Sequence, residues 1–330
     1  MIPVTALSDK DSDTGCNEAG NIIIVAALYK FTALPDYREL RVPLLDICRT
    51  QHVKGTLLLA NEGINGTVAA ERSGIDALRD YLDKDGRFAD LEYKEAPAFS
   101  MPFYRIKVKL KKEIVTLGVP DIDPRSFSGI RVDPQQWNKL INDPEVLVID
   151  TRNHYEYLIG TFRNAVSPET NSFSDFPRYV KQTLDPMRHK KIAMFCTGGI
   201  RCEKASAYLL QQGFHKVYQL RGGILRYLEE TAPDENLWNG ECFVFDSRVA
   251  VNEKLEPGVH EQCYSCRMPV SPGDRESEKF EQGVSCPHCY EKLTKERRKR
   301  LRERQRQVEL ARQRNYQHIG AVFNSSEKQT

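Results

Sequence analysis

Hydrophobic residues in the first third of the chain alternate between strand-like and helix-like spacing. Apolar runs at residues 21–31, 54–60 and 67–70 predict three β-strands. Between the first two runs, residues 36–51 carry apolar side chains at helical spacing. A second helix is predicted from a capping Ser73 to about Leu82.

A further strand is predicted at residues 104–110, where apolar and basic residues alternate, so that Lys107 and Lys109 point the same way. The resulting order, βαββαβ, predicts a ferredoxin-like or acylphosphatase-like domain over residues 21–119. Glycine and asparagine at residues 61–66 predict a turn. Asn61, Glu62 and Asn65 either only form this turn or contact a substrate.

A second unit follows a linker marked by Pro120 and Pro124. Apolar runs at residues 146–149 and 191–195 predict buried strands, and residues 205–210 have helical spacing. Strands that alternate with helices predict an α/β fold for this part of the chain.

The chemistry of this unit centres on Cys196, which lies where a predicted strand ends and a glycine-containing loop leads into a helix. Backbone N–H groups of the loop, the helix N-terminus and the side chain of Arg201 would favour a thiolate, which is the nucleophilic form. Four residues separate Cys196 from Arg201, whereas cysteine phosphatases have five, so the smaller loop suits a sulfur-sized group. The alternative is a purely structural cysteine before a helix.

Neighbouring residues are predicted to support this loop. Thr197, Gly198 and Gly199 supply its backbone N–H groups. Asp150 and Arg152, at the end of the strand predicted at residues 146–149, would brace it by ion pairing, or form only a structural pair at a helix start. Cys202 would resolve an oxidised or persulfidated Cys196 as a disulfide, or serve as a small buried residue.

Cysteine, glycine and proline become more frequent after residue 232, where regular periodicity fades. Two CxxC pairs separated by nineteen residues match a four-thiolate zinc site, and their cysteines are Cys263, Cys266, Cys286 and Cys289. We therefore predict a small zinc-binding module over residues 233–294, stabilised mainly by its metal. Four reduced cysteines without a metal are the alternative.

Charge is unevenly distributed in a chain of 330 residues whose formal net charge is only +2. Residues 295–314 hold ten Lys or Arg and three Glu, which predicts a basic helical tail over residues 295–330 that either binds nucleic acid or is simply solvated.

Residues 1–20 lack the features of a secretory signal and predict a disordered leader. No apolar run is long enough to span a bilayer. These features predict a protein of the reducing cytoplasm without a membrane partner.

Several segments of the α/β unit together resemble the rhodanese superfamily. Residues 150–157 are similar to the motif that opens this fold, residues 196–204 to its active-site loop and residues 213–224 to its closing segment. The resemblance implies a rhodanese-like domain over residues 130–232.

The whole arrangement resembles one family, the rhodanese-domain, oxygen-dependent tRNA uridine-34 hydroxylases. Residues 59–67, 105–118, 196–204 and 263–289 carry this resemblance. It implies tRNA as the partner, hydroxylation at C5 of the wobble uridine, O2 as co-substrate, an electron donor that the sequence does not identify, and Cys196 as an active cysteine that can carry a persulfide.

The basic strand gains a role from this resemblance, because Arg105, Lys107, Lys109 and Lys112 would contact tRNA phosphates; a merely solvated strand face is the alternative. A plain sulfurtransferase that forms a persulfide on Cys196 is the alternative enzyme. A non-enzymatic RNA-binding adapter is a third interpretation, against which the cysteine and its loop arginine argue.

Overall fold

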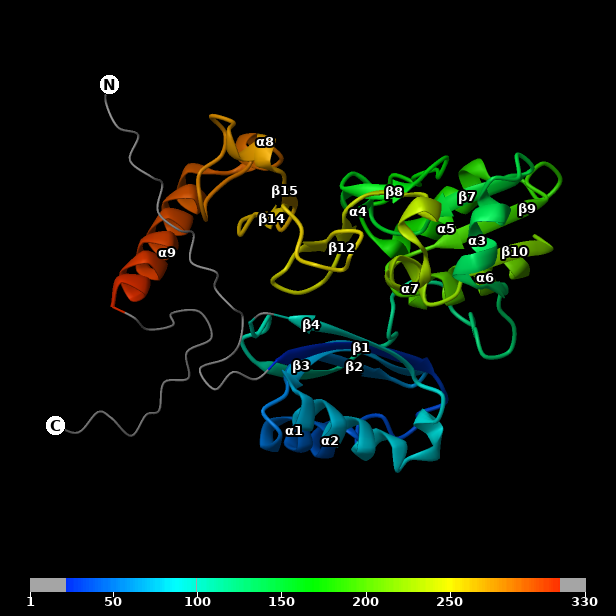
Figure 1. The fold of residues 1–330 in the computed structure, drawn as a ribbon, viewed down its shortest axis with the longest axis horizontal. Helices are drawn as coiled ribbons and strands as arrows, with labels where there is room; N and C mark the ends of the chain where they lie inside the picture. Colours follow the sequence, from blue (N-terminus) through cyan, green and yellow to red (C-terminus); the bar gives the residue numbers. More distant parts are fainter. Residues whose placement is uncertain (1–21, 99, 315–330) are drawn as a thin grey trace, which may run out of the picture.

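The computed structural model describes residues 22–98 and 100–314. The predicted leader, residues 1–20, and the end of the predicted tail, residues 315–330, lie outside the described residues. Figure 1 shows an N-terminal sheet with helices on one side, an α/β unit on its other side, and a C-terminal part that ends in a long helix.

The N-terminal domain is a five-stranded sheet in the order β4-β1-β3-β2-β5. Neighbouring strands are antiparallel except β5, which runs parallel to β2. The strands are β1 (Ile23–Phe31), β2 (Lys54–Ala60), β3 (Gly63–Glu71), β4 (Glu92–Ala98) and β5 (Ile106–Leu110). The first four strands have the order expected of a ferredoxin-like or acylphosphatase-like sheet.

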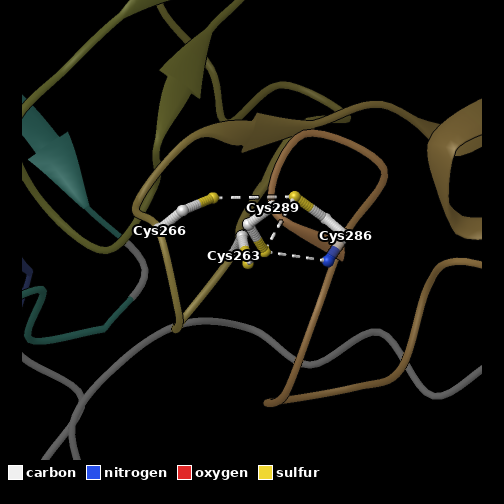
Figure 2. Close-up of side chains that lie close together, drawn as sticks. All are labelled: Cys263, Cys266, Cys286 and Cys289. Atoms are coloured by element: carbon white, nitrogen blue, oxygen red, sulfur yellow. Dashed lines mark hydrogen bonds between the residues drawn. The ribbon is translucent and has the colours of Figure 1, made fainter. Parts of the chain in front are cut away.

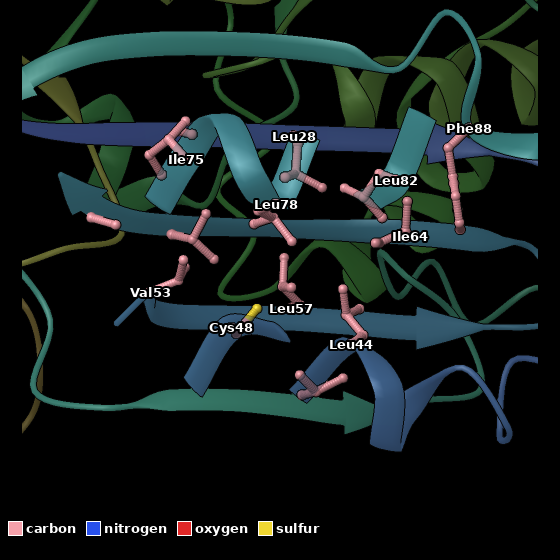
Figure 3. Packing of buried hydrophobic residues seen from close by; sticks show 14 of the residues in the cluster. Leu28, Leu44, Cys48, Val53, Leu57, Ile64, Ile75, Leu78, Leu82 and Phe88 are labelled. Carbon is pink, nitrogen blue, oxygen red and sulfur yellow. The ribbon is translucent and has the colours of Figure 1, made fainter. Parts of the chain in front are cut away.

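Helices α1 (Arg41–Thr50) and α2 (Arg72–Asp83) cover one face of this sheet. Alternate residues of the strands, such as Leu28, Leu57 and Ile64, meet Leu44 of α1 in a continuous apolar core (Figure 3). Because side chains alternate along a strand, the other face of the same sheet is left to meet the α/β unit.

Three details differ from the sequence-based expectations for this domain. The strand predicted at residues 104–110 is an added edge strand, β5, and the fourth strand of the βαββαβ order is β4. The turn predicted at residues 61–66 occupies only residues 61–62, since β3 begins at Gly63. Ser73 lies inside α2, whose N-cap is Glu71.

The α/β unit is a parallel sheet in the order β6-β10-β9-β7. Its strands are β6 (Ile130–Val132), β7 (Val146–Asp150), β9 (Lys191–Phe195) and β10 (Lys216–Leu220). Its helices are α3 (Pro134–Ile141), α4 (His154–Tyr157), α5 (Phe176–Thr183), α6 (Ile200–Gln211) and α7 (Gly223–Glu230). Asp150 pairs with Phe195 in the register of β7 and β9, so the Cys196 loop and residues 150–156 leave the same edge of the sheet.

The C-terminal part begins by completing the α/β unit. Trp238, Cys242, Val244 and Val251 belong to its buried core, and β11 (Trp238–Gly240) pairs with β8 (Gly160–Phe162). The four cysteines and α9 (Lys295–Gln313) follow. The short elements of this part are β12 (Cys242–Phe243), β13 (Ala250–Val251), β14 (Glu261–Gln262), β15 (Pro269–Val270) and α8 (Pro272–Arg275).

Candidate active site

The Cys196 loop is held by backbone hydrogen bonds on both of its sides. Gly199, with a φ of 101°, is the N-cap of α6, and its N–H donates to Sγ of Cys196 at 3.1 Å. The carbonyls of Cys196 and Thr197 accept from the N–H groups of Ile224 and Leu225 at 3.0 and 3.1 Å. The start of α7 therefore fixes the loop from behind, and the start of α6 holds the sulfur.

The thiol of Cys196 is acidic although it is buried. Burial alone would raise its pKa, but hydrogen bonding from Cys202, the charge of Arg201 and the backbone N–H groups of Arg201 and Cys202 outweigh burial and lower the pKa to about 6. At neutral pH this side chain is therefore mainly a thiolate. Its role as the nucleophile remains a prediction.

We expect the low pKa of Cys196 to appear directly in its reaction with iodoacetamide. Because only the thiolate reacts, the rate of Cys196 alkylation should rise through pH 6 and level off above about pH 7. An ordinary thiol would continue to gain reactivity up to about pH 9. Peptide mass spectrometry across this range measures the rate, and a midpoint above pH 8 would contradict the assignment.

Arg201 does not present its guanidinium freely to an anion. Its two terminal nitrogens each donate to one carboxylate oxygen of Glu156 at 2.8 Å, and Nη2 also lies 3.3 Å from Oγ1 of Thr197. Both side chains of the ion pair are buried. Arg201 thus acts on Cys196 through its charge, while the backbone N–H groups contact the sulfur.

Asp150 and Arg152 form the predicted ion pair, with Nη2 of Arg152 donating to Oδ2 of Asp150 at 2.6 Å. Arg152 is fully buried, also donates to the carbonyl of Gly160, and lies over the ring of Trp238 at 5.1 Å. The pair therefore joins β7 to β8 and to the segment at Trp238. Its contact with the loop is indirect, through the neighbouring ring of Phe195.

A cavity of about 580 Å³ lies between the N-terminal sheet and the Cys196 loop. Its walls are the sheet face that the helices leave uncovered, the Cys196 loop with the start of α6, and the segment after β12. The sheet contributes Ala27, Tyr29, Thr56, Thr67 and Lys94, the loop and α6 contribute Cys196, Gly198 and Arg201, and the segment after β12 contributes Phe245 and Arg248. This volume lies within the range of small-molecule and single-nucleoside sites. The reactive thiolate therefore faces a partly open cavity that both domains build.

A buried ion cluster closes the two domains on each other. Lys204 of α6 is only 2% exposed, and its ammonium donates to Glu62 at 2.9 Å, to Glu113, and to the carbonyl of Val115 at 3.1 Å. Burial raises the pKa of Glu62, whereas the hydrogen bond from Lys204 helps to hold the pKa of Glu113 below its usual value against the effect of burial. Residues of the predicted turn thus connect directly to the helix that carries the active-site loop.

Asn65, another residue of that turn, has a structural contact of its own, and its role toward a substrate stays a prediction. Nδ2 of Asn65 donates to the carbonyl of Ile114 at 2.8 Å, and the N–H of Ile114 donates to Glu62 at 2.7 Å. These bonds hold the segment after β5 against β3. Asn65 also lines the cavity.

The basic strand β5 borders the cavity. Lys107 and Lys109 lie on the face opposite the buried Val108 and pair in register with Thr56 and Leu58, which line the cavity. Arg105 shares this face by alternation, while Lys112 is exposed after the strand ends. Lys111, which the sequence interpretation did not select, lies in the cavity wall.

The four cysteines of the predicted zinc site lie together, as Figure 2 shows. Their sulfur atoms all lie within 4.8 Å of one another, with Cys266–Cys286 at 3.6 Å and Cys263–Cys289 at 3.9 Å. Tetrahedral coordination at about 2.3 Å per Zn–S bond requires sulfur atoms roughly 3.8 Å apart. The donor set and its spacing therefore fit a structural zinc ion.

Metal content tests this assignment. We expect about one zinc per purified chain and its loss in Cys286→Ser, because three thiolates leave the tetrahedron incomplete. Hydrogen exchange should then accelerate across residues 261–293, whose small core consists largely of these cysteines. Cys242→Ser, a buried cysteine outside the cluster, is the matched control and should keep its zinc. Equal zinc in both variants would contradict the site.

Helix α9 is attached to this cysteine module. Its Arg297 donates to the carbonyl of Ser265 at 3.1 Å, Arg298 lies 4.3 Å from the ring centre of Tyr290, and Arg302 pairs with Glu281 at 2.6 Å. The first half of the predicted tail is therefore a helix, and several of its cationic side chains already contact the cysteine module.

Among the described residues, no helix combines the length and apolar character that crossing a membrane needs.

Family models match both large domains. Residues 23–114 match the UPF0176 acylphosphatase-like domain, and residues 133–230 match the rhodanese-like domain. The chain is thus a protein with a rhodanese-like domain, the class that its cysteine loop and parallel sheet define. Together with the UPF0176 domain, this is the architecture of the tRNA uridine-34 hydroxylase family. The family resemblance and the fold class expected from the sequence are confirmed.

Solved structures resemble part of the chain. The rhodanese-like domain of an Anabaena protein is 20% identical over 33% of this chain and 78% of its own, with a TM-score of 0.27. A rhodanese-related protein from Thermoplasma volcanium is 21% identical over 32% of this chain and 95% of its own, with a TM-score of 0.25. Thiosulfate sulfurtransferase from Pseudomonas aeruginosa is 20% identical over 30% of this chain and 18% of its own, with a TM-score of 0.25.

The rhodanese-like domain indicates an enzyme, and the pair of domains supports a sulfurtransferase-like or tRNA-modifying role.

The sequence interpretation missed Glu156, Lys204 and Phe245 as site residues. Glu156 had a local signal, since Asn153 and Glu156 have the spacing of a capping box, and the N–H of Asn153 donates to Glu156 at 3.0 Å. Lys204 had none, because its partners Glu62 and Glu113 are distant in sequence. Phe245 had none that marks it as a residue of the cavity wall.

Proposed function

We propose that this protein hydroxylates C5 of the wobble uridine 34 in tRNA, using O2 and electrons from a reductant. The observation that carries this proposal is the cavity that the UPF0176 domain builds over Cys196. A cavity of this size next to the reactive group can hold a nucleobase, whereas a small sulfur donor would leave most of it unfilled. The domain architecture supports the same reaction.

The surroundings of the cavity suit a nucleic acid. Arg105, Lys107 and Lys109 form a cationic row beside it and make no ion pair with any described residue. Phosphates on either side of an inserted nucleoside would contact such a row, which adds affinity without sequence specificity. The base itself would leave the anticodon loop and enter the cavity, as enzymes that modify bases require. The reaction would take place in the cytoplasm.

Nucleoside mass spectrometry of total tRNA tests the proposal. Cells that lack this gene should lose 5-hydroxyuridine derivatives, and wild-type protein should restore them while Cys196→Ala does not. Zinc content and tRNA affinity of the variant serve as controls for folding, since neither depends on this thiol. If the nucleosides never fall, or if Cys196→Ala restores them, the proposed reaction or its active cysteine is wrong.

A sulfurtransferase is the second candidate, and the acidic Cys196 favours it. The amide-held thiolate of a rhodanese-like loop is suited to attack the outer sulfur of thiosulfate, which releases sulfite and leaves a persulfide. Persulfide formation from thiosulfate, followed by transfer to cyanide, would support this candidate in a protein that leaves tRNA unchanged.

A further inference from the structure

Two polar side chains of the N-terminal sheet extend from its uncovered face toward the loops around Cys196. Tyr29 of β1 pairs in register with Glu92 of β4, two residues before Lys94. Cross-strand partners share a face, and so do residues two apart on one strand, so Tyr29 and Lys94 rise from the same face as diagonal neighbours. Both side chains line the cavity. An aromatic and a long side chain in this arrangement are close enough to contact one ligand.

Each of the two side chains lies against a glycine next to Cys196. The hydroxyl oxygen of Tyr29 lies 3.0 Å from the point that a Cβ atom on Gly199 would occupy, and the N–H of Gly199 holds the sulfur of Cys196. Cε of Lys94 lies 3.0 Å from the equivalent point on Gly222, whose nitrogen is 3.7 Å from the Cβ point of Gly199. Because neither glycine carries a side chain, both polar groups can approach a ligand held next to the sulfur.

Both groups have hydrogen-bond donors left for a ligand. Among the described residues, the hydroxyl of Tyr29 has no hydrogen-bond partner. Within the same part of the chain, Lys94 forms one ion pair, in which its Nζ lies 3.5 Å from a carboxylate oxygen of Glu229, a side chain that is 58% exposed. An ammonium group has three N–H donors, so this long contact leaves donors for a ligand.

We propose that Tyr29 and Lys94 recognise the base in the cavity by donating hydrogen bonds to O4 of uracil, and that this contact selects uridine over cytidine at position 34. The inference rests on the function proposed above and identifies the residues that distinguish its substrate. O4 is carried by C4, which is bonded to C5. A base whose O4 is held beside Gly199 therefore has its C5 next to the sulfur of Cys196.

The difference between a carbonyl and an amino group provides the selectivity. Uracil has an oxygen acceptor at C4, whereas cytosine has an amino group that donates. The ammonium of Lys94 only donates and cannot pair with that amino group, whereas the hydroxyl of Tyr29 can donate or accept. Lys94 therefore supplies most of the discrimination, and Tyr29 aligns the base against the loop.

The surroundings of the two groups strengthen this recognition. Burial lowers the pKa of Lys94. Burial and the charges of Glu203 and Glu92 raise the pKa of Tyr29 well above its usual value, so its hydroxyl stays protonated and remains a donor. Little water is left to replace a missing acceptor, so a base without O4 leaves the desolvated ammonium unpaired at a large cost in affinity.

The selectivity is tested with two anticodon stem-loop RNAs that differ only in carrying uridine or cytidine at position 34. Their dissociation constants for the full-length protein are measured without O2, so that no turnover takes place. We expect the wild type to bind the uridine RNA about tenfold or more tightly, and Lys94→Met to bring the two constants within about twofold. Lys94→Arg keeps a charged donor and should keep a preference for uridine.

Two further variants separate recognition of the base from damage to the fold. Tyr29→Phe removes only the hydroxyl and should weaken the binding of both RNAs by about two- to tenfold. Lys139→Met, an exposed lysine on α3, is the control and should match the wild type. A variant whose fold is merely disturbed would lose affinity for both RNAs and keep their ratio, so the ratio reports recognition alone.

Product analysis separates the inference from the function on which it rests. Wild-type protein given both RNAs, air and dithiothreitol should form 5-hydroxyuridine and leave the cytidine RNA unchanged, as measured by mass spectrometry. An unchanged preference in Lys94→Met, or equal binding of both RNAs by a wild-type protein that forms 5-hydroxyuridine, would overturn the recognition by Lys94 and Tyr29 and leave the hydroxylase function intact. Equal binding by a wild-type protein that forms no product with any thiol reductant would overturn both.

Discussion

Replacement of Glu156 by glutamine is expected to lower the free energy of unfolding by about 3–5 kcal/mol, the usual cost of leaving one partner of a buried ion pair unpaired. Glu156 is fully buried and binds Arg201 through two bonds of 2.8 Å. Glutamine keeps the shape but only one acceptor oxygen, so the charge of Arg201 loses its compensation. Urea denaturation of the full chain measures the loss.

The same substitution should also change Cys196. With Glu156 neutral, the uncompensated positive charge of Arg201 should lower the pKa of Cys196 further, and the midpoint of its alkylation should move below pH 6. Glu145→Gln is the matched control, since Glu145 pairs with Lys191 at 2.7 Å but its side chain is 74% exposed. We expect this control to cost less than about 1 kcal/mol and to leave the alkylation profile unchanged. Equal destabilisation by both variants would contradict the role of Glu156.

Low pH should weaken the ion pair between Glu156 and Arg201. Burial alone would raise the pKa of Glu156, but the charge and hydrogen bonds of Arg201 hold it below its usual value. A carboxylate whose pKa falls on folding stabilises the protein fully above the pKa it has in the unfolded chain. That stability is lost as the pH falls through its lower, folded-state pKa.

Helices and strands with one apolar face could be predicted from the sequence. The strand β4, which carries several charged residues, was missed. Strand β4 carries Glu92, Lys94 and Glu95, all of which line the cavity, and it contains Pro97. Its sequence therefore lacks the apolar alternation of a strand that covers a core. As an edge strand it tolerates a proline that an inner strand would exclude.

Whether a residue of the site could be predicted depends on how far its partners lie from it in the sequence. The loop around Cys196 could be predicted because its glycines, its helix start and its arginine are consecutive, so local sequence defines its geometry. The partner of Arg201 and the contact between Lys204 and Glu62 could not, since 142 positions separate the latter pair and only the packed domains bring them together. The sequence predicted the turn at Glu62 without revealing that it binds α6, the helix that follows the Cys196 loop.

Lys204→Met is therefore expected to lower activity strongly at a moderate cost to the fold. Methionine preserves much of the apolar length of lysine but leaves Glu62 and Glu113 without their shared cation, so the carboxylates should separate and the N-terminal sheet should move away from the Cys196 loop. We expect the kcat/KM of the proposed RNA hydroxylation to fall at least 100-fold. The loss of stability should stay near about 2 kcal/mol, because each carboxylate is about 20% exposed and can be hydrated.

Lys204→Met should change the relative position of the two domains and leave the chemistry of Cys196 unchanged. Cys196 alkylation in Lys204→Met should keep its midpoint near pH 6, since none of the groups that lower the pKa of this thiol involves Lys204. Small-angle scattering should report a larger radius of gyration, and proteases should cut faster between residues 115 and 129. Lys139→Met, an exposed lysine on α3, is the matched control and should resemble the wild type in every assay. Full activity with an unchanged radius in Lys204→Met would show that the cavity closes without this ion cluster.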